Sequence, residues 1–365
     1  MLSPRSPFIN AISAARSRYR SLGDTTSIVV IWTVIGALLA WAVIGETEAL
    51  VIGIVTGSIF ALGAIGLTLI YGILKFAHFA HGDTMMLSAY LAFFFLTGTL
   101  VGTGQTDAQP LRWALNDLPS AAEPIFGFSF GYGLLLSMVA AAVAMAIILV
   151  VLDRLIYRPL RRRSSGIVIF AIASLAVAIS VRSVILIFWG PSPRFYVRGI
   201  RPTTDLPFDI RVVTDQFFIF AAAIILAGLV YMLLFRTKLG KAMRAMSDNA
   251  DLALVSGINT ERVVTWTWAI GGTLIAIAGV LLALQSQLKP ELGFVLLLPL
   301  FASTILGGIG SPQGAFAGGM IVGISQEVAV TFDFLSPGYK FSVAVVILIV
   351  ILLVRPRGLF GAPQR

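Results

Sequence analysis

Residues 49–70 read ALVIGIVTGSIFALGAIGLTLI, a run of 22 positions without a charged side chain. About 20 mostly apolar residues are enough for an α-helix to cross the hydrocarbon core of a bilayer. The whole chain shares this bias, because 58% of its residues are hydrophobic and only 12% are charged. Soluble domains carry about 25% charged residues, so the composition indicates a chain that is solvated by lipid.

Nine further apolar runs flank this one. They cover 28–45, 84–101, 132–152, 166–189, 216–235, 263–285, 294–310, 313–331 and 340–354. We therefore predict an all-α polytopic membrane protein with about ten transmembrane helices. The transmembrane domain is expected at 28–354, between a basic N-terminal tail at 1–27 and a C-terminal tail at 355–365. The N-terminal tail is compatible both with an interfacial helix and with a partly disordered segment.

The distribution of lysine and arginine orients these helices. Ten spans place both termini on one side of the membrane, and assigning that side as cytoplasmic leaves 18 Lys and Arg inside and 7 outside. Cytoplasmic loops of membrane proteins carry such an excess, so we predict that both termini are cytoplasmic. The net charge of +9 is explained in the same way. The sequence has no basic stripe with interleaved aromatic residues, which is the pattern that would indicate nucleic-acid binding.

Glycines recur four residues apart inside the predicted spans, in the series Gly53 and Gly57, Gly310, Gly314 and Gly318, and Gly319 and Gly323. Small residues at this spacing let helix backbones approach closely in a membrane, which predicts tight packing within the bundle. The alternative is that these glycines line a close-fitting solute path.

Motifs for catalysis are missing. The chain has no cysteine and two histidines, and it contains neither G-x-S-x-G nor H-E-x-x-H. Gly240-Lys241 lacks the remaining residues of a phosphate-binding loop. We therefore expect no enzyme activity, no metal site and no bound cofactor, and we expect any ATP and Mg to be bound by a separate subunit.

The predicted cytoplasmic loop at 236–262 has the pattern of two short helices. Asp248 or Asn249 can cap the second helix, and Gly257 can end it. Asp251 would lie in its first turn, where a negative charge interacts favourably with the helix dipole. Its apolar face would consist of Leu252, Leu254 and Val255. Such a helix fits a groove in a soluble partner or, alternatively, the bilayer surface.

A second irregular segment, Phe79-Ala80-His81-Gly82-Asp83, interrupts apolar sequence. Irregular backbone at membrane depth occurs only where it is buried in protein or lines water, so this segment can be a broken helix at a solute path. An ordinary loop at the inner surface is the alternative, and a proton relay through His81 and Asp83 is a third reading.

Two ionisable residues fall inside spans at similar predicted depth, Arg182 and Glu327. Charged residues in a membrane usually face the bundle interior and find a partner. We predict a structural ion pair between them, with snorkelling of Arg182 to the outer headgroups as the alternative.

Four segments resemble the branched-chain amino acid permease family of ABC importers. In the 236–262 loop, the family's pattern G-x-x-x-R-A…D-N-x-E-A-A-x-x-x-G-I-N is matched by Gly240, Arg244, Ala245, Asp248, Asn249, Ala253, Gly257, Ile258 and Asn259. The other three segments are Gly57 to Asp83, the corner Phe188 to Arg194 and the hinge Ile305 to Ala315. Asp251 and Leu252 replace the usual Glu and Ala, and His78 replaces a common Asn.

The resemblance implies a type II ABC importer permease fold in a bacterial inner membrane, without nucleic-acid binding. It implies two ATPase subunits, a second permease subunit that is identical or paralogous, and an external solute-binding protein. Branched-chain amino acids are the expected solute, and urea or short amides are the alternative. A secondary transporter driven by ions is the rival class, although acidic residues inside the spans are few, with Glu327 the clearest and Asp83 at the edge of a span.

The resemblance also assigns candidate roles to residues. The ATPase-coupling candidates are Arg244, Asp248, Asn249, Asp251, Leu254 and Gly257. The translocation-path candidates are His78, His81, Gly82, Asp83, Gly307 and Gly308.

Overall fold

The computed structural model describes residues 45–100, 109–110, 113–197, 199, 201–206, 210–332, 335–355 and 357–360, together with six single positions between 33 and 43. The predicted N-terminal tail at 1–27 and most of the first predicted span at 28–45 lie outside the described residues, as does the end of the C-terminal tail.

A helix lies at each of the other nine predicted spans. These are α2 (Thr47–Leu74), α3 (His81–Thr97), α4 (Tyr132–Leu152), α6 (Ile167–Trp189), α7 (Thr214–Arg236), α10 (Thr260–Gln285), α11 (Leu292–Gly307), α12 (Pro312–Ala329) and α13 (Lys340–Val354). Six helices in the described part of the chain are long and apolar enough to cross a membrane. Helices α3, α11 and α12 are not among these six.

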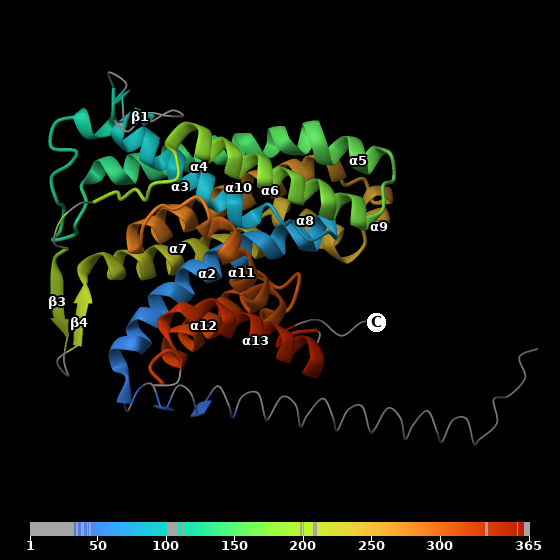
Figure 1. Ribbon diagram of the computed structural model, residues 1–365. Helices are drawn as coiled ribbons and strands as arrows, with labels where there is room; N and C mark the ends of the chain where they lie inside the picture. The colour runs from blue at the N-terminus through green and yellow to red at the C-terminus, as the bar shows by residue number, and fades with distance from the viewer. Residues whose placement is uncertain are drawn as a thin grey trace, which may run out of the picture.

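Shorter elements connect these helices. They are β1 (Thr99–Leu100), β2 (Gln109–Pro110), the 3-10 helix η1 (Leu115–Asp117), the π-helix η2 (Asp153–Tyr157), α5 (Arg158–Arg162), β3 (Thr203–Leu206), β4 (Ile210–Val213), α8 (Lys238–Asp248), α9 (Ala250–Val255) and the 3-10 helix η3 (Pro337–Tyr339). Strands β1 and β2 form one antiparallel pair, and β3 and β4 form another. Figure 1 shows the β-strands at one end of the bundle and α5, α8 and α9 at the opposite end.

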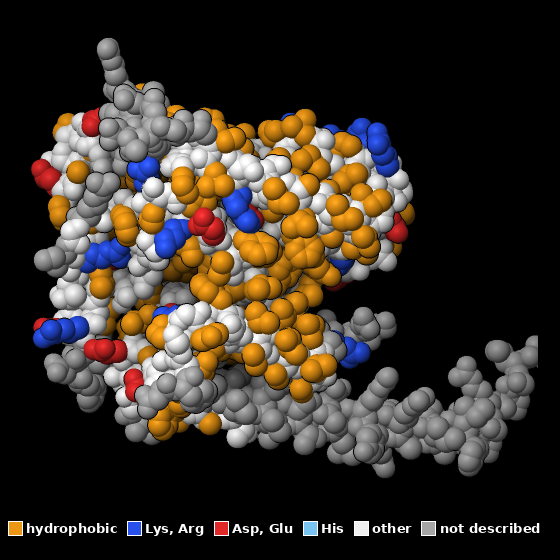
Figure 2. Space-filling view, in the orientation of Figure 1, with side chains coloured by type: hydrophobic (Ala, Val, Ile, Leu, Met, Phe, Trp, Pro, Cys, Tyr) orange, Lys and Arg blue, Asp and Glu red, His pale blue; other side chains and the backbone are white. Residues whose placement is uncertain are grey.

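The bundle has a buried centre and an apolar periphery. In the most apolar stretches of α10 and α2, 78% and 72% of the residues are buried, whereas α4, α6, α7 and α13 reach at most 33%. The exposed residues of these outer helices are largely aliphatic and aromatic, and hydrophobic side chains cover much of the face seen in Figure 2. A surface of this kind is suited to lipid rather than water.

Close glycine contacts hold the central helices together. Gly57 of α2 lies against Gly319 and Gly323 of α12, and a Cβ on Gly323 would overlap the backbone of Gly57. A Cβ on Gly318 would likewise overlap the carbonyl oxygen of Ser303 in α11. The predicted tight packing at these glycines is therefore present, because the backbones cross where only hydrogen fits.

Candidate functional site

The connection between α2 and α3 re-enters the bundle. Helix α2 ends at Leu74, and Lys75 takes a left-handed conformation with φ 59°. The chain then runs without helical structure to His81, whose Nε2 lies 2.8 Å from the carbonyl oxygen of Gly63. Gly63 is eleven residues before the end of α2, which corresponds to about 16 Å of helix. Residues 75–80 therefore run back into the bundle alongside α2, and α3 begins about 16 Å from the C-terminal end of α2.

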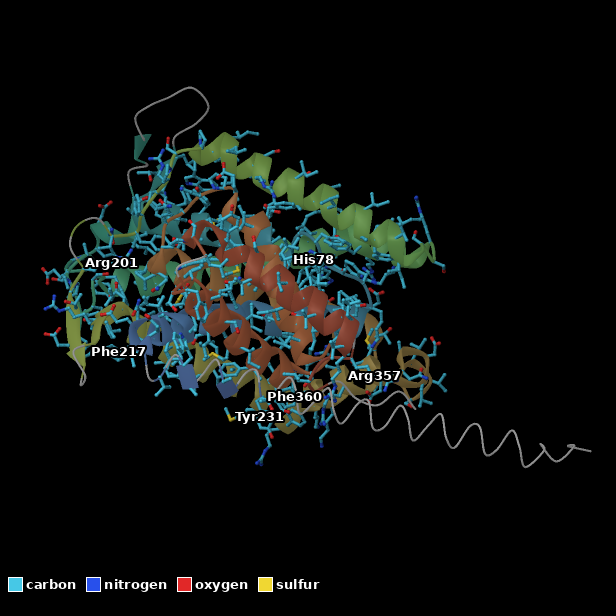
Figure 3. The ribbon with its side chains drawn as sticks, turned by 60° about the horizontal axis from the view of Figure 1, so that its bottom comes forward. His78, Arg201, Phe217, Tyr231, Arg357 and Phe360 are labelled. Carbon is cyan, nitrogen blue, oxygen red and sulfur yellow. The ribbon has the colours of Figure 1, made fainter. Side chains whose placement is uncertain are left out.

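His78 and His81 lie inside the protein and not in an inner surface loop. Both side chains are fully buried, and Figure 3 shows His78 within the helix bundle. The His78 ring packs edge-on against Trp268, with ring centroids 5.1 Å apart, and against Tyr157 and His81. The predicted break in helical structure is therefore present and is packed in protein, whereas its place on a solute path stays a prediction.

Asp83, in the first turn of α3, forms the ion pair of this region. Its side chain is 1% exposed and lies 2.9 Å from the guanidinium of Arg182 on α6. Arg182 also donates through Nε, at 3.0 Å, and stacks over the ring of Phe294, with 5.0 Å between its Cζ and the ring centroid. Gly82 lies against Gly293 of α11, so α3 and α11 touch beside this pair.

The predicted ion pair between Arg182 and Glu327 is wrong. Glu327 on α12 instead lies 2.5 Å from the Lys340 ammonium, at the start of α13, and it accepts a hydrogen bond from Thr56. Arg182 and Glu327 are not paired although their predicted depths are similar, because Arg182 binds Asp83 on α3 and Glu327 binds Lys340 on α13. Snorkelling of Arg182 does not describe the structure either, since its guanidinium turns inward to Asp83.

A polar network near the α5 end was missed by the sequence analysis. The buried Asp153 accepts hydrogen bonds from Trp268 Nε1, at 2.8 Å, and from Arg161, at 2.6 Å. Arg158 forms a second ion pair with Glu261, 2.9 Å away at the start of α10. Asp153 is the first residue of the π-helix η2, and its bond to Trp268 connects η2 to α10. An acidic residue directly after the apolar run 132–152 was the available signal.

The predicted two short helices of the cytoplasmic loop are present as α8 and α9. Thr237 caps α8, and Asn249 caps α9 by accepting a hydrogen bond from the Leu252 amide at 2.9 Å. Gly257 follows α9 with φ 82°, as expected for a residue that ends a helix. The side chains of Leu252, Leu254 and Val255 are 64%, 58% and 86% exposed, so α9 presents an apolar face.

Helix α8 is joined to the C-terminal end of α2. The Lys75 ammonium donates a hydrogen bond to the Ser247 carbonyl oxygen at 2.7 Å, and the Ser247 hydroxyl donates to the Gly72 carbonyl oxygen at 3.1 Å. Burial lowers the pKa of Lys75, and the Asp248 carboxylate nearby opposes that shift. These two hydrogen bonds connect α8 both to the end of α2 and to the segment that follows it.

Gly307 and Gly308 form the turn between α11 and α12. Gly308 has φ 100°, which favours glycine, and Gly307 packs against Gly314. The C-terminal segment covers this turn, since the amide of Phe360 donates to the Gly307 carbonyl oxygen at 3.2 Å. A nearby cavity is lined by Gly310, Ser311, Pro312 and Gln313 instead. The described residues contain no group of three or more acidic, histidine or cysteine side chains placed to hold a metal ion.

Comparison with known proteins identifies relatives along most of the chain. Residues 49–353 match the family model described as branched-chain amino acid transport system / permease component. The high-affinity branched-chain amino acid transport system permease protein BraD of Pseudomonas aeruginosa is 30% identical over 87% of this chain and 96% of its own. The corresponding permease protein LivH of Escherichia coli K12 is 30% identical over 86% and 94%.

A more distant similarity is confined to one part of the chain. The xylose transport system permease protein XylH of Escherichia coli K12 is 36% identical over 96 residues, which is 24% of each chain. No solved structure matches the chain.

Proposed function

The chain belongs to the branched-chain amino acid transport permease family, and from this premise we propose that it is the membrane-spanning subunit of an ATP-driven importer for branched-chain amino acids. It is an integral, helical membrane protein, and its relatives are transport permeases and not enzymes. We place it in a bacterial inner membrane. Urea or short amides remain the alternative solutes.

The topology in this proposal has ten transmembrane helices with both termini in the cytoplasm. The excess of lysine and arginine on the assigned inner side supports it. The arrangement of the connecting elements also supports it, because α5, α8 and α9 gather at one end of the bundle while the β-strands occupy the other. The β3–β4 end is then the outer side, where a solute-binding protein would deliver the solute.

Coupling to ATP hydrolysis is assigned to the α8–α9 loop. The observation that carries this assignment is the capped helix α9 with its exposed apolar face, which directly follows α8, and α8 is bonded to α2 through Ser247. Two ATPase subunits would bind ATP and Mg, and each would bind the α8–α9 loop of one permease subunit. A second permease subunit would provide the second loop. Arg244, Asp248, Asn249, Asp251, Leu254 and Gly257 are the proposed coupling residues.

An ion-coupled mechanism has less support. Asp83 and Glu327 are the acidic residues that such a mechanism would use inside the membrane. Each is bonded to a basic side chain, Arg182 and Lys340 respectively, which leaves neither carboxylate free to carry a coupling ion in this conformation.

Purification of the full chain from its native membrane tests the proposal. We expect ATPase subunits to copurify, and we expect L-leucine presented with its binding protein to stimulate ATP hydrolysis by the reconstituted complex. The proposal would be overturned if no ATPase copurified with the chain, or if no branched-chain amino acid changed the rate of ATP hydrolysis by the complex.

A further inference from the structure

A cavity of about 280 Å³ opens at the α8 end of the bundle, between α2, α7, α8 and the start of α12. Its apolar wall comes from Leu69 and Ile73 of α2, Leu234 and Phe235 of α7, and Met243 of α8. Drug-sized ligands occupy pockets of about 300 Å³ or more, so this volume suits a smaller solute.

Two opposite charges line the same cavity. Arg244 and Asp248 are four residues apart on α8 and therefore lie on one face of the helix, about 5–6 Å apart at their Cβ atoms. The Arg244 guanidinium stacks over the Phe235 ring, with 4.7 Å between its Cζ and the ring centroid. Within the described part of the chain, neither Arg244 nor Asp248 forms an ion pair, although Lys75 lies near enough to Asp248 to attract it.

A second hollow lies beside the first along α7. It measures about 280 Å³, shares Leu234 and Phe235 with the first and is also lined by Ile65, Gly228 and Tyr231. Ile65 is nine residues before the end of α2, which is about 14 Å of helix. The two hollows together follow α7 from membrane depth to the inner end, and Figure 3 labels Tyr231 on this helix.

We propose that the cavity beside α8 is a release site for an aliphatic α-amino acid. Arg244 receives the carboxylate, Asp248 receives the ammonium group, and the wall formed by Leu69, Ile73 and Leu234 receives the side chain. The pairing is chemically specific, because a zwitterion with an aliphatic side chain needs a cation, an anion and an apolar surface together. This inference rests on the proposed function and names where its solute leaves the bundle.

Truncated ligands separate direct contact from a structural role. Binding of L-leucine, 4-methylpentanoate and isoamylamine to the full-length chain in nanodiscs is measured by saturation-transfer difference NMR. The last two compounds are leucine without its ammonium group and without its carboxylate. Loss of one charge-assisted contact corresponds to about a tenfold loss of affinity.

The site predicts a crossed pattern. Asp248→Asn should weaken leucine about tenfold while leaving 4-methylpentanoate unchanged, and Arg244→Gln should weaken leucine about tenfold while leaving isoamylamine unchanged. Lys241→Gln removes a positive charge from the same helix outside the cavity and should bind all three compounds like the unmodified chain. A variant that only disturbs the fold would weaken every compound together.

Two other results would count against the site. Equal loss for all three compounds in either variant, or unchanged leucine binding in both variants, overturns it. If either result occurs while the unmodified complex still imports leucine, the proposed function stands and only the release site fails. If the unmodified complex imports no branched-chain amino acid, the proposed function fails and this inference fails with it.

Discussion

Arg182 and Asp83 show how one ion pair can fix the position of a broken helix. Arg182→Leu would leave the Asp83 carboxylate buried without its partner, which destabilises a protein by about 3 kcal/mol, the lower end of the range, since the Arg182 side chain is 27% exposed. The double variant Arg182→Leu with Asp83→Leu should recover part of that loss. Thermal unfolding in detergent, followed by tryptophan fluorescence, measures both.

The matched control for this cycle combines Arg182→Leu with Glu327→Leu. These residues have separate partners, so their effects should add within about 0.5 kcal/mol. A recovery in this control pair, or strict additivity for Arg182 and Asp83, would contradict the observed pairing.

The sequence showed that Arg182 needed a partner but not which one. The depth estimate compared only Arg182 and Glu327 and assumed straight spans, whereas Asp83 was expected at the edge of a span. The return of residues 75–80 into the bundle brings Asp83 to Arg182, and the local pattern at Phe79 to Asp83 indicated a break without indicating its depth. The long-range contact of His81 with Gly63 establishes it.

Helices α8 and α9 were predictable because their signals are local. A capping asparagine, an acidic first turn and a terminal glycine all act within a few residues, and each is found where expected. The π-helix η2 was not predictable in the same way, since its position depends on contacts of Asp153 with Trp268 and Arg161, which are distant in sequence or on another turn.

The exposed face of α9 predicts the effect of a charge there. Asp251→Lys and Leu254→Asp should each reduce solute-stimulated ATP hydrolysis at least tenfold while membrane insertion stays near normal, because loop residues outside the bundle contribute little to its packing. Ser164→Asp, at an exposed residue that follows α5 at the same end of the bundle, should keep the stimulation. Normal transport by both α9 variants would contradict the coupling assignment.

The glycine crossings predict opposite signs for one substitution. Gly318→Ala and Gly323→Ala should each destabilise the protein by about 2 kcal/mol, because the added methyl group would overlap a neighbouring backbone. Gly228→Ala in α7 should be neutral or stabilising, since nothing lies within 4 Å of its added Cβ and alanine favours helix. Equal effects at all three glycines would contradict close packing at the crossings.

At the scale of the whole molecule, the cysteine-free sequence allows a direct test of topology. Single cysteines are introduced as Thr204→Cys in β3 and Ser256→Cys after α9. A membrane-impermeant maleimide should label Thr204→Cys in intact spheroplasts and Ser256→Cys only after permeabilisation. The reverse labelling pattern would invert the assigned orientation, and labelling of both from outside would contradict the opposed ends of the bundle.

One measurement tests both the family assignment and the proposed mechanism, namely the identification of the energy source that drives solute uptake. The chain is reconstituted in proteoliposomes with its ATPases, a second permease subunit and the solute-binding protein, and uptake of radiolabelled L-leucine is followed. We predict uptake that requires ATP, continues when proton and sodium gradients are dissipated, and stops when the ATPase is inactivated. Uptake driven by an ion gradient without ATP would contradict the account.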